Sequence, residues 1–235
     1  MTHEPALHPA AEAETAPHPD DAFAAELRGF GPAGILTSLA VLAASTFWPL
    51  KGIAVLAWAR ASRTPLREIG FVRPRSWIGG LAIGIVFGGA FKLAMKAVVM
   101  PLLGADPVNH AYHYLAGNAA ALPGIVIVIL VGGAFGEEAF FRGFLFERLG
   151  RLFGSGAVAR AGIVLITTAV FALAHYPDQG LAGVEQATFT GLVFGTIFAA
   201  TGRLWMVMCA HAAFDFVAIA LIYWNLEAGV AHLIF

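Results

Sequence analysis

Two adjacent glutamates and an arginine interrupt an apolar stretch, where ionisable side chains are costly. The stretch reads GGAFGEEAFFRGFLFERL and contains Glu137, Glu138 and Arg142. Four-residue spacing places Glu138 and Arg142 on one helix face, whereas Glu137 is rotated by about 100°. Arg142 can therefore neutralise Glu138, and Glu137 is left to accept a proton from water as a general base. The alternative is a Glu–Arg pair that ends the helix, with Glu137 reaching bulk water.

Two histidines occur in later apolar stretches. His175 ends the segment FALAH, and His211 stands four residues before Asp215 in HAAFD. That spacing predicts that the Asp215 carboxylate lies beside the His211 imidazole and fixes its tautomer. Taken singly, His175 could be a packed histidine, and the His211–Asp215 pair could be a hydrogen bond within one helix.

The acid and the two histidines are predicted to lie at similar depths in a membrane. Depth is counted from the arginine of the adjoining loop, which is Arg148 for Glu137, Arg160 for His175 and Arg203 for His211. The separations are 11, 15 and 8 residues. At a rise of about 1.5 Å per residue they correspond to roughly 17, 22 and 12 Å. We therefore expect three helices to bring these side chains to one water-filled chamber.

The other ionisable residues of the apolar stretches are interpreted as peripheral. Lys92 and Lys96 are expected to extend to the outer membrane interface, and Lys51 is treated in the same way. His110 and His113 lie in a loop, where we expect solvated side chains rather than a metal-binding pair.

Membrane-spanning helices must position these residues, because the composition excludes an ordinary soluble domain. Of 235 residues, 59% are hydrophobic and 12% are charged, whereas soluble domains average about 25% charged residues. The formal net charge of −1 provides no basic surface for nucleic acid. The single cysteine, Cys209, excludes an internal disulfide and a cysteine-rich metal site.

Apolar runs of the roughly 20 residues that cross a bilayer recur after residue 30. We place six spans, near 33–59, 77–100, 120–141, 157–174, 184–202 and 204–224. The predicted fold class is therefore all-α, a polytopic transmembrane bundle of about six spans, within a range of six to eight. Pro49 and Lys51 make the first span kinked, re-entrant or shorter. The acidic segment 1–30 is predicted to be a disordered tail, and 31–235 the membrane-embedded bundle.

The distribution of arginine predicts the orientation. Segment 60–75 has five arginines and one acid, whereas segment 101–119 has no lysine or arginine. By the positive-inside rule the first segment is cytoplasmic and the second lies outside. The N-terminal segment would then lie outside, and the chamber would open towards the cytoplasmic side. We expect a multi-pass protein of a bacterial cell membrane.

Taken together, the three motifs resemble the CPBP family, the CAAX prenyl protease 2 and bacteriocin-processing group of intramembrane endopeptidases. The family pattern is Glu-Glu-x-x-x-Arg, then Phe-x-x-x-His, then His-x-x-x-Asn or Asp. This chain matches it in order and spacing over about 120–220, with Glu137–Arg142, Phe171–His175 and His211–Asp215. Residues 189–211 add the glycine-rich run and the Thr-Gly-x-Leu-Trp segment that precede the last motif.

The resemblance implies an endopeptidase that cuts a membrane-associated protein or peptide, of which prenylated CAAX proteins are one example. It implies the following roles: Glu137 activates water with His175, His211 and Asp215 lie on the oxyanion side, and Glu138 and Arg142 orient the site. Many members have Asn where this chain has Asp215. An ionised Asp cannot donate to an oxyanion, so its expected role is to orient His211.

Two mechanisms stay open at this point. Without a metal, Glu137 and His175 polarise water in a dry cavity. With zinc, Glu137, His175 and His211 would be the ligands and one position would stay open. We favour the mechanism without a cofactor, because adjacent glutamates lack the His-Glu-x-x-His spacing of zinc proteases.

Two other classes of function use the same residue types. Intramembrane Glu, His and Asp also form the proton relays of proton-coupled or ion-coupled transporters, although no internal repeat is evident here. A catalytically idle immunity or scaffold protein is the third class. The expected partners are a membrane-associated substrate and the lipid bilayer, and the sequence specifies no oligomeric state.

Overall fold

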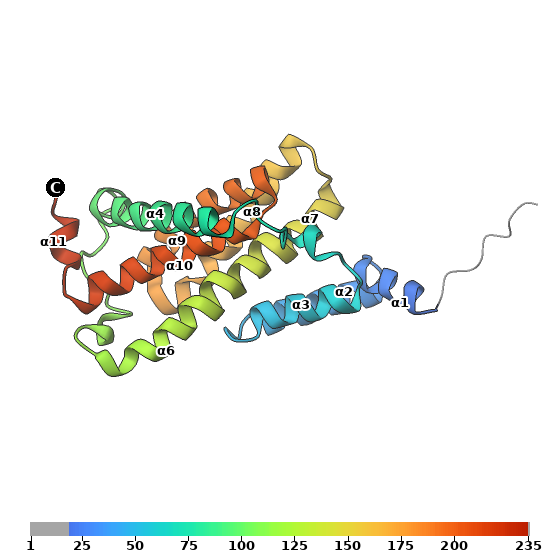
Figure 1. The fold of residues 1–235 in the computed structure, drawn as a ribbon, viewed down its shortest axis with the longest axis horizontal. Coiled ribbons are helices and arrows are strands. Elements are labelled where there is room, and N and C mark those ends of the chain that lie inside the picture. Colours follow the sequence, from blue (N-terminus) through green and yellow to red (C-terminus); the bar gives the residue numbers. More distant parts are fainter. Residues whose placement is uncertain (1–18, 235) are drawn as a thin grey trace, which may run out of the picture.

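The computed structural model describes residues 19–234, which form a bundle of helices (Figure 1). The α-helices are α1 (Pro19–Arg28), α2 (Pro32–Ala44), α3 (Lys51–Ala61), α4 (Trp77–Ala94), α5 (Met100–Leu102), α6 (Leu122–Ile127), α7 (Leu145–Phe153), α8 (Ala157–Ala174), α9 (Tyr176–Thr201), α10 (Leu204–Tyr223) and α11 (Glu227–Ala231). Two π-helical segments, η2 (Met95–Val99) and η5 (Val128–Phe144), continue α4 and α6. Short 3₁₀ turns are η1 (Leu66–Ile69), η3 (His113–Leu115) and η4 (Ala119–Ala121).

Five helical stretches are long and apolar enough to cross a membrane. They are Trp77–Leu102, Ala119–Phe153, Ala157–Ala174, Tyr176–Thr201 and Leu204–Tyr223. A sixth span would require that α1 and α2, which meet at an angle of 60°, cross together. The predicted all-α membrane bundle is confirmed, and the last five predicted spans each correspond to one of these stretches.

The first predicted span is replaced by a helical hairpin. Within 33–59, α2 ends at Ala44 and α3 begins at Lys51, with a turn that contains Pro49 between them. The 13 residues of α2 extend about 20 Å, which is shorter than the roughly 30 Å of a bilayer core. We call this element the α2–α3 hairpin.

Both ends of the hairpin lie at the arginine-rich end of the bundle. Arg148 of α7 donates to the backbone carbonyls of Arg28 and Gly29, at 2.5 and 2.7 Å. Arg28 also pairs with Glu68 of the segment 60–75. The prediction that the N-terminal segment lies on the opposite side from segment 60–75 is therefore wrong for the described residues. The predicted disordered tail is likewise helical over Pro19–Arg28, and its remainder lies outside the described residues.

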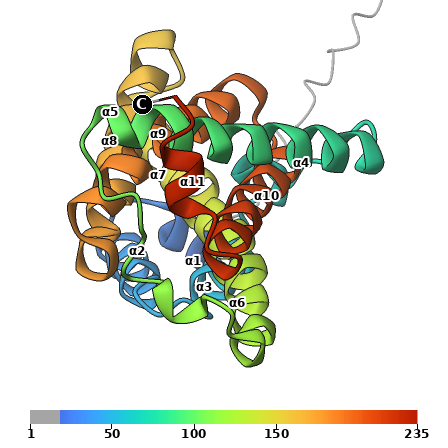
Figure 2. The same ribbon diagram turned by 90° about the vertical axis from the view of Figure 1, so that its left-hand side faces the viewer.

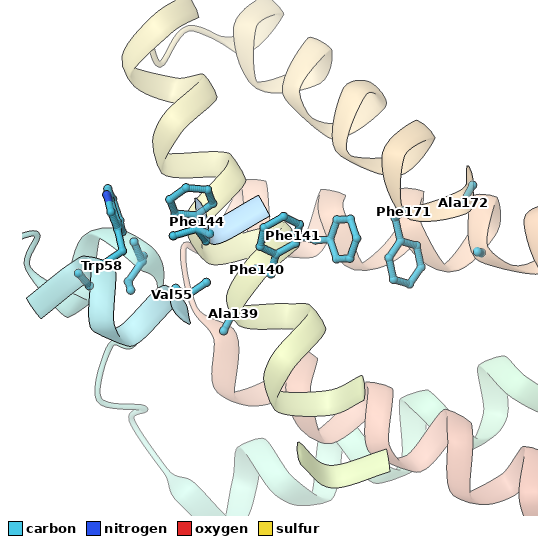
Figure 3. Close-up of a cluster of buried hydrophobic side chains, with 12 residues drawn as sticks. Val55, Trp58, Ala139, Phe140, Phe141, Phe144, Phe171 and Ala172 are labelled. Carbon is cyan, nitrogen blue, oxygen red and sulfur yellow. The ribbon is translucent and has the colours of Figure 1, made fainter. Parts of the chain in front are cut away.

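Aromatic packing attaches α3 of the hairpin to η5. Trp58 contacts Phe144 edge to face, with ring centroids 4.8 Å apart, in a buried cluster that extends to Phe171 of α8 (Figure 3). A Cβ atom on Gly52 would lie 2.2 Å from the Phe135 ring, so only glycine allows this approach. The close packing keeps the start of α3 beside the middle of η5.

Glycines also bring α4 and α10 into backbone contact, and the two helices lie side by side (Figure 2). A Cβ atom on Gly88 would lie 2.0 Å from the Ala210 carbonyl oxygen. Small residues permit such approaches in lipid, where packing replaces the hydrophobic effect between helices. This contact fixes the position of α10, which carries two of the predicted site residues.

Candidate active site

Four of the predicted site residues line one cavity of about 900 Å³ inside the bundle. Glu137 comes from η5, His175 from the junction of α8 and α9, and His211 and Asp215 from α10. Elements far apart in the sequence therefore bring the acid and both imidazoles to a common chamber, as their similar depths predict. Glu138 and Arg142 lie beside the cavity and do not line it.

Glu138 is the centre of a buried ionic triad. Its Oε1 accepts a hydrogen bond from Arg142 at 3.0 Å and lies 2.6 Å from Nδ1 of His211. Glu138 is 0% and Arg142 2% exposed, and the guanidinium lies 4.7 Å from the centre of the Phe171 ring. The predicted Glu138–Arg142 pair is confirmed. Because a carboxylate can only accept, Nδ1 of His211 carries the proton and Nε2 is directed away from the triad.

Two further carboxylates lie near Nε2 of His211. Oδ2 of Asp215 is 3.5 Å away and Oε2 of Glu137 is 3.9 Å away. The sequence predicted that Asp215 fixes the tautomer of His211, and this is wrong because Glu138 bonds the ring nitrogen that carries the proton. The space beside these groups exists because residue 133 is glycine, whose Cβ would lie 3.1 Å from Oδ2 of Asp215.

Lys51 is the partner of Glu137, which sequence reasoning missed. Its Nζ donates to Oε1 of Glu137 at 2.8 Å, from the first residue of α3. The α2–α3 hairpin therefore carries a cation into the chamber. The prediction that Lys51 extends to the membrane interface is wrong. The only sequence signal was a lysine within an apolar run, and a positive charge at membrane depth suggests a functional site.

His175 is oriented by its own helix. Its Nδ1 lies 2.7 Å from the Phe171 carbonyl oxygen, and its ring packs edge to face on Phe171 at 4.5 Å. Because a carbonyl only accepts, Nδ1 carries the proton and Nε2 is left as a proton acceptor. His175 thus lines the cavity with a free basic nitrogen, although it makes no ion pair with Glu137 within 4.0 Å in the described chain.

The donors do not form a metal site. Within residues 19–234, no three His, Cys, Asp or Glu side chains are placed to hold one ion. Glu138 bonds one nitrogen of His211, and the Lys51 ammonium lies against an oxygen of Glu137. The zinc ligand set of Glu137, His175 and His211 therefore does not fit this arrangement of the described residues.

Lys92 and Lys96 are buried, contrary to the prediction that they extend to the membrane interface. They are 6% and 8% exposed. Lys96 donates to the Pro107 carbonyl at 2.5 Å and to Glu227 at 3.1 Å. Lys92 donates to Oε1 of Gln186 at 2.6 Å and lines the cavity.

Two loop residues in the cavity wall come from the arginine-poor end. Asn109 and Tyr112 belong to the segment between α5 and η3, whereas no residue of segment 60–75 lines the cavity. Burial and the nearby carboxylates of Asp215, Asp178 and Glu137 raise the pKa of Tyr112 to about 12, so its hydroxyl keeps its proton. The lining gives no support to the expected opening towards the arginine-rich side.

The comparisons with known proteins agree with the motifs. Residues 119–217 match the family model described as type II CAAX prenyl endopeptidase Rce1-like. No curated protein and no solved structure matches the chain. The matched segment begins with the long helix that contains η5 and includes all six predicted site residues. The resemblance to the CPBP family is thereby confirmed over residues 119–217, and the Rce1-like family of type II CAAX prenyl endopeptidases, whose model this segment matches, is a family of proteases.

Proposed function

We propose that the chain is an intramembrane endopeptidase that hydrolyses a peptide bond of a membrane-associated substrate in this cavity. The observation that carries the proposal is the placement of Oε2 of Glu137 3.9 Å from Nε2 of His211 inside a membrane bundle. One water molecule can contact both atoms, because two hydrogen bonds of about 2.8 Å can meet across that separation.

Glu137 is the proposed general base. Oε1 of Glu137 is held by Lys51, so Oε2 is the oxygen that takes a proton from the water. The water oxygen forms a bond to the scissile carbonyl carbon, and the carbon–nitrogen bond then breaks. Glu137 passes its proton to the leaving amine, which balances the hydrolysis. His175 lines another wall of the cavity, and its free Nε2 accepts a hydrogen bond from the same water.

His211 is the proposed oxyanion group. With Nδ1 bonded to Glu138, a protonated His211 donates from Nε2 to the oxygen that becomes negative during attack. Oδ2 of Asp215 lies 3.5 Å from that nitrogen, and its negative charge stabilises the protonated ring. Glu138 and Arg142 act through His211 and position it.

Cleavage of a membrane-anchored peptide tests the function. Purified protein in liposomes should cut peptides that carry an S-farnesyl-cysteine near the C-terminus, and mass spectrometry of the products identifies the bond. An ion-coupled transporter would instead show flux in sealed vesicles and no product. An idle immunity or scaffold protein would show neither activity.

Chelators should leave the cleavage rate unchanged. EDTA or 1,10-phenanthroline removes zinc from sites with an open position, whereas a glutamate-activated water needs none. We expect the rate after chelation and dialysis to stay within about twofold of the untreated rate. Loss of activity that returns with added zinc would contradict the metal-free mechanism.

Gly133→Ala should reduce cleavage while the protein stays folded. The added methyl would lie 3.1 Å from Oδ2 of Asp215 and 3.6 Å from Nε2 of His211, where the water and the scissile carbonyl must fit. We expect kcat to fall by about 100-fold, the loss that misplacement by about 1 Å can cause. Gly124→Ala is the matched control, because its added Cβ meets nothing within 4 Å on the same continuous helix. Equal rates for both variants would refute the proposed position of the water.

A further inference from the structure

The proposed oxyanion position has one donor so far, which is Nε2 of His211. Asp215, whose Oδ2 lies 3.5 Å from that nitrogen, can only accept a hydrogen bond while it is ionised. Oxyanion sites of acyl-transfer enzymes combine several donors around the oxygen that becomes negative. A second donor would be a proton-bearing group in the wall of the same cavity.

Tyr112 lines this cavity together with Glu137, His211 and Asp215. It belongs to the loop between α5 and η3, which lies at the same end of the bundle as α11 (Figure 1). Among residues 19–234 its backbone is hydrogen-bonded but its hydroxyl is not. The hydroxyl is also not sealed from solvent, so it is available to a ligand inside the cavity.

The ring of Tyr112 packs beside the helix that carries Glu137. It lies against a buried apolar cluster, which consists of Leu115, Ile125, Ile129 and Ile222. Ile129 precedes Gly133 by four residues on η5, and a Cβ atom on Gly133 would meet Asp215 and His211. Four residues are about one helical turn, a rise of about 5.4 Å, over which a tyrosine side chain can extend. The hydroxyl can therefore reach the space beside these two residues.

The electrostatic environment of Tyr112 agrees with this placement. Burial is the main cause that raises its pKa to about 12, and among the charged groups the carboxylate of Asp215 acts most strongly, followed by Asp178 and Glu137. Such charge effects decline with distance, so these carboxylates lie near the hydroxyl. The hydroxyl keeps its proton at neutral pH and can donate it in a hydrogen bond.

The loop holds Tyr112 in place mainly through Asn109. Oδ1 of Asn109 accepts from the backbone nitrogen of Tyr112 at 3.3 Å, and the Asn109 nitrogen donates to Oε1 of Glu227 at 3.1 Å. Glu227 pairs in turn with Lys96. The nitrogen of Leu115, a fully buried residue, donates to the Tyr112 carbonyl at 3.0 Å. A donor that is fixed before substrate binds costs no reorganisation during the reaction.

We propose that the Tyr112 hydroxyl is a second oxyanion donor, which donates a hydrogen bond to the scissile carbonyl oxygen beside Nε2 of His211. The bond strengthens as the oxygen becomes negative, and Tyr112 keeps its proton throughout. The inference rests on the proposed function and adds a catalytic residue to it. Tyr112 lies outside the three motifs and outside residues 119–217, which match the family model.

Tyr112→Phe should lower kcat for an S-farnesyl-cysteine peptide in liposomes by about 100-fold, because loss of one oxyanion donor costs about 10²–10³-fold. KM should change little, since the bond is made in the transition state. The unfolding temperature in detergent should stay the same, because no partner among the described residues loses a hydrogen bond.

Tyr114→Phe is the matched control. Tyr114 lies two residues further along the same loop, is 59% exposed and does not line the cavity. Its replacement should keep kcat within about twofold of the wild type, because a donor outside the cavity cannot reach the oxyanion. Wild-type kcat in Tyr112→Phe protein would overturn the inference and leave the proposed function intact.

A second background separates donation to the oxyanion from a packing role. In Asp215→Asn protein an amide N–H group stands near Nε2 of His211 and can take over part of the donation. The loss caused by Tyr112→Phe should then shrink to about tenfold or less, because two donors to one atom are not additive. An equally large loss in both backgrounds would overturn the inference.

Binding of a transition-state analogue tests the inference without turnover. A farnesylated phosphinate peptide carries a tetrahedral anion in place of the scissile carbonyl, and Tyr112→Phe should weaken its binding by about tenfold. The same change should leave binding of the uncleaved peptide to Glu137→Gln protein within about twofold. Equal weakening of both ligands would overturn the inference. A wild type that neither cleaves the peptide nor binds the phosphinate would refute the proposed function as well.

Discussion

Glu137→Gln should lower kcat for peptide cleavage by about 10³-fold and leave the fold intact. The amide keeps the size of the carboxylate and still accepts the hydrogen bond from Lys51, but it cannot take a proton from water. General base catalysis contributes about 10²–10⁴-fold in enzymes. Single-turnover cleavage in liposomes measures the loss, and thermal unfolding in detergent checks that the variant is folded.

Glu185→Gln is the matched control for Glu137→Gln. Glu185 is also an intramembrane carboxylate, on α9, but it does not line the cavity. Its replacement should keep kcat within about twofold of the wild type, because the side chain does not line the cavity in which the reaction is proposed to occur. A Glu137→Gln enzyme that retains full kcat would exclude Glu137 as the base. Asp215 or His175 would then be the candidate general base.

The sequence predicted the parts of the site that depend on local spacing. Glu138 and Arg142 are four residues apart on one helix, so their pair follows from helical geometry alone. The shared cavity of Glu137, His175 and His211 followed from their similar depths. Residues of neighbouring membrane spans that lie equally far from the same membrane surface occupy the same layer of the bundle.

The sequence could not predict the partners that come from distant elements. Glu138 bonds His211 across 73 positions, and Lys51 bonds Glu137 across 86 positions. Asp215 has the right spacing to hold His211, so local reasoning assigned it the role that Glu138 performs. Tertiary packing decided between the two carboxylates.

The α2–α3 hairpin was predicted only in outline, as a first span that is kinked, re-entrant or shorter. Apolar residues continue through 33–59, so hydropathy predicts one span, and the turn at Pro49 is the sole interruption. Packing of Trp58 on Phe144 and of Gly52 on Phe135 holds the two short helices in place. These contacts involve residues that are about 80 positions apart, which no local pattern records.

Glu138→Ala should destabilise the protein by about 3–5 kcal/mol, which makes it the most damaging single replacement in the site. The change leaves the guanidinium of Arg142 buried without a counter-ion, at 2% exposure. It also removes the acceptor of the Nδ1 proton of His211. We expect the unfolding temperature in detergent to fall by about 10 °C, whereas Glu137→Gln should shift it little, although the two glutamates are adjacent.

A double variant separates the structural from the catalytic role of Glu138. Glu138→Met combined with Arg142→Met removes both charges and fills the space with apolar side chains, which is often neutral for stability. We expect its unfolding temperature to recover most of the loss seen in Glu138→Ala. Cleavage should stay low, because His211 still lacks the acceptor that directs Nε2 into the cavity. If activity returned together with stability, Glu138 would only balance the charge of Arg142, and the orientation of His211 would have to come from Asp215.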